Sequence, residues 1–156
     1  MSDWIDRIKQ NDAEKSEDNR LENEMRLHRA SVIKAKAPAF WGELNDRVES
    51  DCEKLNLTFK DDLRRQCSFT RIGPSEFELR GSVSGSSVLR VRLNAEAQTI
   101  DQELFEGRGD RGKRRESLVL NIDRNENLIL DGLRGPTGDP AVLSEALIRK
   151  VIQADR

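Results

Sequence analysis

The residues best suited to chemistry in this sequence form a basic, glycine-rich segment, GRGDRGKRR, at positions 107–115. Glycines let backbone amides approach a phosphate closely, and arginine binds phosphate oxygens through paired hydrogen bonds. A solvated hairpin tip explains the same composition, and the segment has no aromatic side chain on which a base could stack. The segment predicts a polyanion or nucleic-acid site whose ligands would be Arg108, Arg111, Lys113, Arg114 and Arg115.

A second glycine-rich stretch, residues 132–138, precedes the last predicted helix. Helix N-termini attract anions because their first backbone N–H groups lack partners within the helix. Asp139, however, occupies the predicted N-cap position, where its carboxylate accepts from those N–H groups and repels a phosphate. The stretch also lacks the Gly-Lys-Ser or Gly-Lys-Thr ending of a P-loop. We therefore expect a structural turn here.

The chain contains few residues that could serve in catalysis or bind a metal. It has one histidine, His28, no tyrosine, and two cysteines, Cys52 and Cys67. His28 lies on a predicted helical stripe, where a packing role is expected. Zinc sites use spaced pairs of cysteine and histidine, which this sequence does not have. The acidic side chains at 61–62 and at 76 and 78 are expected to be solvated. We predict no enzymatic activity, no cofactor and no metal.

Composition and charge restrict the class of protein. Of the 156 residues, 36% are charged and 35% are hydrophobic, so part of the chain must be highly solvated. The net charge of −2 gives no overall attraction to nucleic acid or to an anionic membrane. No apolar run approaches the roughly 20 residues that span a bilayer, and the first residues do not resemble a secretion signal. We therefore expect a cytoplasmic protein with no membrane contact, in which both cysteines are reduced core thiols.

A sheet is predicted for residues 66–132, where short runs alternate apolar and polar residues between Gly, Asn, Asp or charged turns. One parity is apolar, as in Phe77 and Leu79, so one face is expected to be buried and the other to be solvated. The connections are too short for helical crossovers, which predicts a five- to six-stranded antiparallel meander. The solvated face is a candidate binding surface that includes Glu76, Glu78, Arg80, Arg90 and Arg92.

Two amphipathic helices are predicted to cover the apolar face of this sheet. The second spans residues 139–153, with Asp139 as its N-cap and Pro140 at its first position. Together the sheet and helices give an α+β two-layer domain over residues 37–156. The first helix spans residues 37–56 and carries the apolar stripe Phe40, Trp41, Leu44, Val48, Cys52 and Leu55.

Residues 1–36 are predicted to form a long N-terminal helical arm, since residues 2–36 contain no glycine or proline. The middle of its stripe is polar, so the first part of the helix has almost nothing to bury against its own domain. An exposed cluster with a tryptophan is unusual, so Trp4, Ile5 and Ile8 are predicted to bind a partner. The cluster could dock on the chain's own sheet, on a second copy or on another protein. A second apolar patch contains Leu21, Met25, His28 and Val32.

The main hypothesis is therefore a non-enzymatic module for protein interaction or self-association that forms a homodimer or binds a protein partner through this arm. The alternative is polyanion or nucleic-acid binding through residues 107–115. Pro38 either breaks the helix near residue 36 or kinks one helix, so residues 2–56 form one helix or two. Residues 57–65 are ambiguous, because Leu57 and Phe59 alternate as they would in a strand.

Overall fold

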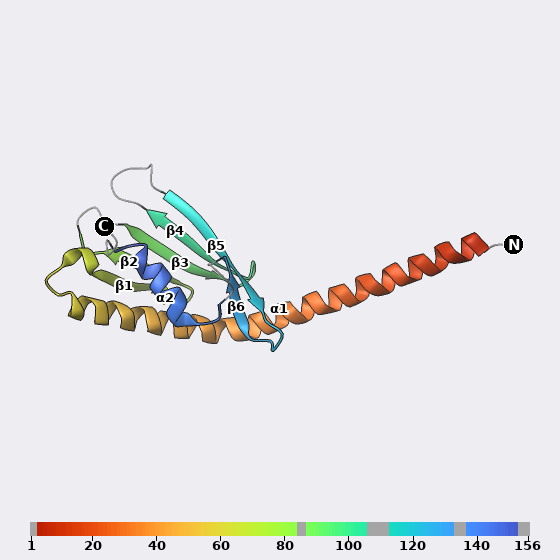
Figure 1. The fold of residues 1–156 in the computed structure, drawn as a ribbon, viewed down its shortest axis with the longest axis horizontal. Coiled ribbons are helices and arrows are strands. Elements are labelled where there is room, and N and C mark those ends of the chain that lie inside the picture. The colour runs from red at the N-terminus through yellow and green to blue at the C-terminus, as the bar shows by residue number, and fades with distance from the viewer. Residues whose placement is uncertain (1–2, 84–86, 106–112, 133–136, 153–156) are drawn as a thin grey trace.

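The computed structural model describes residues 3–83, 87–105, 113–132 and 137–152. It contains one long helix, an open antiparallel sheet and a short C-terminal helix, which confirms the predicted α+β class (Figure 1). Helix α1 spans Asp3–Thr58, a short 3-10 helix η1 spans Leu63–Arg65, and helix α2 spans Pro140–Arg149. The strands are β1 (Cys67–Gly73), β2 (Glu76–Gly81), β3 (Val88–Asn94), β4 (Thr99–Phe105), β5 (Lys113–Ile122) and β6 (Leu128–Asp131).

The six strands pair in chain order and all neighbours are antiparallel, as the meander prediction requires. Phe77 of β2, for example, lies opposite Arg71 of β1 on one side and Val91 of β3 on the other. Residues of the apolar parity are buried, including Phe77, Leu79 and Leu89. Strands that are neighbours along the chain can pair through short connections, which explains the antiparallel strand order. The alternation of apolar and polar residues predicted which face of the sheet is buried.

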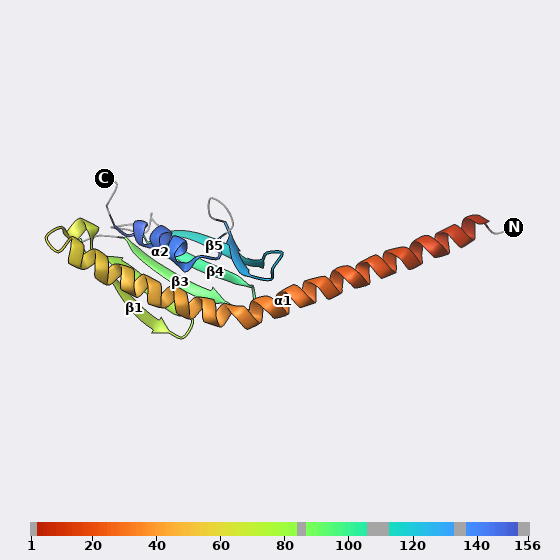
Figure 2. The ribbon, with the colours of Figure 1, turned by 60° about the horizontal axis from the view of Figure 1, so that its bottom comes forward.

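Both helices lie on the apolar face of the sheet, and together they enclose one core (Figure 2). The predicted stripe of α1 points inward, and Leu44 and Val48 are fully buried. The Trp41 ring stacks on Phe77 with a centroid separation of 5.3 Å, and its Nε1 donates to the Pro74 carbonyl at 3.0 Å. Buried aromatic rings with a satisfied polar atom stabilise such an interface strongly.

Helix α1 is continuous through Pro38, which resolves the two possibilities that the sequence allows. Proline has no N–H for the carbonyl four residues earlier, which is that of Lys34. Lys34 and Pro38 are both exposed, so water can satisfy the free carbonyl. The helix changes direction where it reaches the sheet (Figure 2), in the region where a proline kink is expected.

The N-terminal part of α1 leaves the domain and projects away from the sheet (Figure 1). Every residue from 3 to 29 is exposed, and the first buried side chain of the helix is Ile33. The arm therefore does not fold back over the chain's own sheet. Among the described residues, no helix is both long enough and apolar enough to cross a membrane.

The segment after residue 56 is helical, so its strand-like alternation is misleading. Helix α1 ends at Thr58, and one further turn follows in which the Phe59 N–H donates to the Leu55 carbonyl at 2.9 Å. Asp62 then caps η1 by accepting from the Arg64 N–H at 3.1 Å. Local hydrogen bonds from a capping aspartate compete with strand pairing, which explains the outcome.

Asp139 caps α2, as the sequence predicts. The Asp139 carboxylate accepts from the Ala141 N–H at 2.9 Å, and Pro140 begins the helix. A side chain at Gly138 would lie 2.3 Å from the Leu128 carbonyl oxygen, so only glycine fits this close approach. Thr137 pairs with Leu130 and so adds a bridge to the β6 edge. Residues 133–136 of the glycine-rich stretch lie outside the described residues.

Candidate interaction surfaces

The predicted partner-binding residues lie at the free end of the arm. Trp4 is 64% exposed and Ile8 is 50% exposed, and Ile5 beside them is exposed as well. Trp4 and Ile8 are one turn apart and therefore lie on the same side of the helix. The described residues of the domain do not cover this cluster, which we call the arm tip (Trp4, Ile5 and Ile8). The arm tip is an exposed apolar surface that no other described residue of the chain covers.

The second apolar patch of the arm is only partly used by the domain. Leu21 and Met25 are exposed. A packing role was expected for His28, but His28 does not pack in the core. Its Nε2 lies 2.6 Å from a carboxylate oxygen of Glu126 in the turn between β5 and β6. Lys36 donates to the backbone carbonyl of the same residue. These contacts attach the base of the arm to the sheet and leave the rest of the arm free.

On the polar face of the sheet, opposite charges alternate along a row of residues that crosses the strands. One row runs Thr70, Glu78, Arg90, Glu103 and Arg115 from β1 to β5. Arg90 Nε lies 3.5 Å from Glu78 Oε2, and Arg115 Nε lies 3.3 Å from Glu103 Oε1. No described helix covers this face. Because the charges along this row neutralise one another, the row has no strong preference for a ligand of one sign.

The predicted anion-binding residues are only partly described. Arg108 and Arg111 lie outside the described residues, whereas Lys113, Arg114 and Arg115 begin β5 and are exposed. Strand geometry places Lys113 and Arg115 on the polar face and Arg114 on the opposite face. Lys113 and Arg115 both approach Glu103, at 4.0 and 3.3 Å. The structure therefore does not gather these three cations toward one ligand, and anion binding by residues 107–115 stays a prediction.

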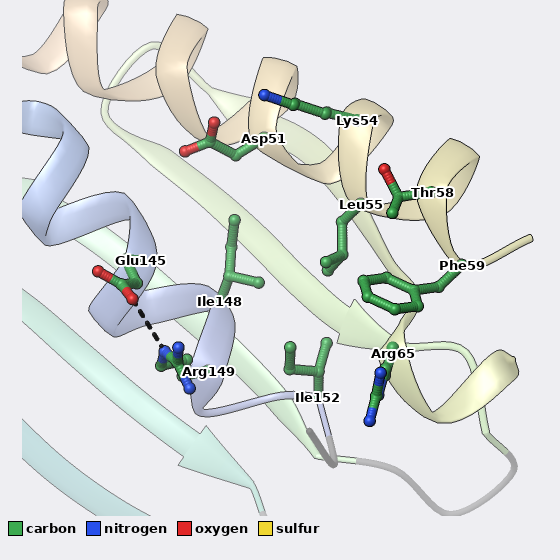
Figure 3. Close-up of a pocket in the computed structure, with 10 residues that line it drawn as sticks. All are labelled: Asp51, Lys54, Leu55, Thr58, Phe59, Arg65, Glu145, Ile148, Arg149 and Ile152. Carbon is green, nitrogen blue, oxygen red and sulfur yellow. Dashed lines mark hydrogen bonds and ion pairs between the residues drawn. The ribbon is translucent and has the colours of Figure 1, made fainter. Parts of the chain in front are cut away.

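A pocket of about 410 Å³ lies between the C-terminal end of α1, α2 and η1 (Figure 3). Its walls are the apolar side chains Leu55 and Phe59 from α1 and the turn after it, and Ile148 and Ile152 from α2 and the residues that follow. The Arg65 guanidinium lies 4.8 Å from the centre of the Phe59 ring, a favourable cation–π distance. The rim of this pocket is polar and consists of Asp51, Lys54, Thr58, Arg65, Glu145 and Arg149.

The acidic residues on the pocket rim already have partners. Arg47 Nε lies 3.1 Å from Asp51 Oδ2, and Arg149 Nε donates to Glu145 Oε1 at 3.1 Å. Within the described part of the chain, the Lys54 ammonium has no carboxylate partner. The pocket therefore combines an apolar interior with one unpaired positive charge on its edge. Pockets of this volume and apolar lining are typical of sites that bind compact apolar groups.

The two cysteines form a buried thiol pair that joins α1 to β1. Cys52 Sγ and Cys67 Sγ are 3.0 Å apart, and both residues are free and buried, as expected. The hydrogen bond between them and their burial raise the pKa of Cys52 above its ordinary value, whereas the same hydrogen bond lowers the pKa of Cys67. Asn56 donates to the Cys67 carbonyl at 2.7 Å and accepts from its N–H at 3.0 Å.

Sequence reasoning missed the pocket because its walls come from segments distant in the chain. Leu55 and Phe59 are spaced by four residues, and that helical interval was the available signal.

The described residues contain no group of three His, Cys, Asp or Glu side chains placed to hold a metal ion. Comparisons with protein-family models, with curated proteins and with solved structures find no match for this chain.

Proposed function

We propose that this protein is a non-enzymatic interaction module whose arm tip docks on a second copy of the chain or on another protein. The observation that carries the proposal is the exposure of Trp4, Ile5 and Ile8 at the end of an arm whose residues 3–29 are all exposed. Tryptophan contributes strongly to protein interfaces because it buries a large apolar area. A polar helix of this kind is marginal in water by itself, so contact with a partner would stabilise it.

The form of the arm supports the same proposal. Residues 3–29 belong to one helix that is continuous with the core of the domain. At 1.5 Å per residue, the arm extends the tip by roughly 40 Å from the first buried turn. Fully burying an isoleucine side chain contributes about 1.5–3 kcal/mol, and Trp4 has a larger apolar area. An arm tip docked by all three side chains therefore supplies apolar burial that offsets part of the cost of association.

Sedimentation velocity over a wide concentration range tests this function. We expect the full-length chain to gain mass with concentration, or to bind a protein partner through the tip. The double variant Trp4→Ala with Ile8→Ala should lose that association, because it removes the apolar surface and leaves the exposed helix intact. Leu27→Ala is the matched control, since Leu27 is equally exposed on the same arm and lies away from the tip.

Two results together would contradict the proposal. The first is that the wild-type chain is monomeric at every concentration, and the second is that the wild type and the tip variant capture the same proteins from a cell extract.

A further inference from the structure

We infer that the arm tip of one copy docks in the pocket between α1, α2 and η1 of a second copy. This inference rests on the proposed function and names the partner and its receptor site. Each copy would then supply one tip and one pocket, and the pocket of each copy would be completed by Trp4 of another.

The arm tip cannot reach the pocket of its own chain. Trp4 and Leu55 belong to the same continuous helix and lie at its two ends (Figure 1). A helix that rises 1.5 Å per residue separates them by roughly 77 Å. Folding back would require α1 to break, and His28 and Lys36 both hold the base of the arm against Glu126. The occupant must therefore come from a different molecule.

The apolar chemistry of the tip matches that of the pocket. Trp4 and Ile8 form a short apolar ridge on one side of a helix, which is the form of a helix that binds in a groove. Leu55, Phe59 and Ile148 converge on the pocket interior in Figure 3. Its volume of about 410 Å³ is enough to bury a compact apolar group.

The charges near the two surfaces are also complementary. Asp12 follows Trp4 and Ile8 at the same interval of four residues, so it lies on the docking side one turn after Ile8. In the described part of the chain, Asp12 has no ion-pair partner, and neither has Lys54 on the pocket rim. We place the arm so that its Asp12 carboxylate faces the Lys54 ammonium across the rim of the pocket. An exposed pair of this kind contributes little affinity, but it favours one orientation of the arm.

Two variants with one defect each test the inference by complementation. Trp4→Ala removes the tip and keeps the pocket, whereas Thr58→Arg blocks the pocket and keeps the tip. Thr58 is exposed and lines the pocket, so its replacement leaves the core unchanged. We expect each variant to be monomeric alone and an equimolar mixture to contain heterodimers, because one tip and one pocket remain intact in each pair.

The neighbouring variant Leu57→Arg is the matched control for Thr58→Arg. Leu57 is 77% exposed and does not line the pocket, so this variant should associate like the wild type. Urea midpoints within the error of the wild type for all three variants, measured at a concentration where the wild type is monomeric, establish that each is folded.

The outcomes separate this inference from the function on which it rests. Association of Thr58→Arg alone at wild-type strength, with loss of association in Trp4→Ala, would overturn the pocket as receptor and leave the arm as the docking element. A mixture of the two variants that stays monomeric, or a wild-type chain that is monomeric at high concentration, would overturn docking on a second copy. Undiminished association of Trp4→Ala would overturn both proposals.

Discussion

At the scale of single residues, the junction between α1 and β1 depends on Cys52, Asn56 and Cys67. The Asn56 amide pairs with both backbone polar groups of Cys67 and so satisfies them at the start of an edge strand. Cys52 lies one turn earlier on α1 and contacts the Cys67 sulfur. A single asparagine and a thiol pair thereby fix the register between helix and sheet at this point.

The thiol pair predicts a loss of stability at alkaline pH. In the unfolded chain both thiols lose their protons near the ordinary value of 9.0, whereas folded Cys52 keeps its proton because its pKa is raised. Cys67, whose pKa is lowered, has lost its proton in both states well above pH 9. There the folded state binds more protons than the unfolded state because of Cys52, so stability falls as pH rises above about 9, by up to about 1.4 kcal/mol per pH unit.

Urea unfolding between pH 8.5 and 10.5 measures this effect. The double variant Cys52→Ala with Cys67→Ala is the reference, because it contains no thiol while all other titrating groups are the same. The free energy of unfolding of the wild type should fall more steeply with pH than that of the variant. Parallel curves for the two proteins would show that Cys52 ionises normally in the fold.

At the scale of the elements, Pro38 is the residue of α1 that least suits a helix. A proline in a helix interior is about 3 kcal/mol less favourable than alanine, and Pro38 is exposed and outside the core cluster. Pro38→Ala is therefore expected to raise the free energy of unfolding by roughly 1–3 kcal/mol. Urea denaturation followed by circular dichroism measures it.

Ala35→Gly is the comparison for the proline variant. It lies one turn earlier on an exposed position and should lower the same free energy by about 1 kcal/mol if this stretch is helical. Destabilisation by Pro38→Ala would mean that the bend at Pro38 is required for α1 to lie correctly on the sheet.

Helices and strands could be predicted from sequence where a pattern of neighbouring residues determines them. The buried side of the sheet follows from the alternation that includes Phe77 and Leu79. The buried side of α1 follows from the helical stripe that includes Leu44 and Val48. The continuity of α1 could not be derived, because a helix with an internal proline persists only when packing on both sides of it supports the helix. The arm tip was visible as an isolated apolar cluster. The pocket was not, because α1 and α2 meet only in the folded chain.

At the scale of the whole molecule, the arm and the domain share a helix and yet depend on each other little. At a concentration where the full-length chain is monomeric, deletion of residues 1–26 should leave the urea midpoint nearly unchanged, because the deleted side chains that the structure describes are exposed and His28 and Lys36 are retained. Circular dichroism should show a lower helical content for the shortened chain. A decrease of more than about 1 kcal/mol in unfolding free energy would show that the arm stabilises the domain directly.

The order of elements also determines when the core can close. The strands pair with their neighbours along the chain, so each hairpin can form soon after its second strand is synthesised. Helix α1 is made first, but α2 covers it last, and Ser144 of α2 donates to Asp51 of α1 across 93 residues. During synthesis the apolar stripe of α1 is therefore buried only after the sheet, and finally α2, have formed. The slow step of folding is expected to be the meeting of the two ends of the domain, after the hairpins have formed.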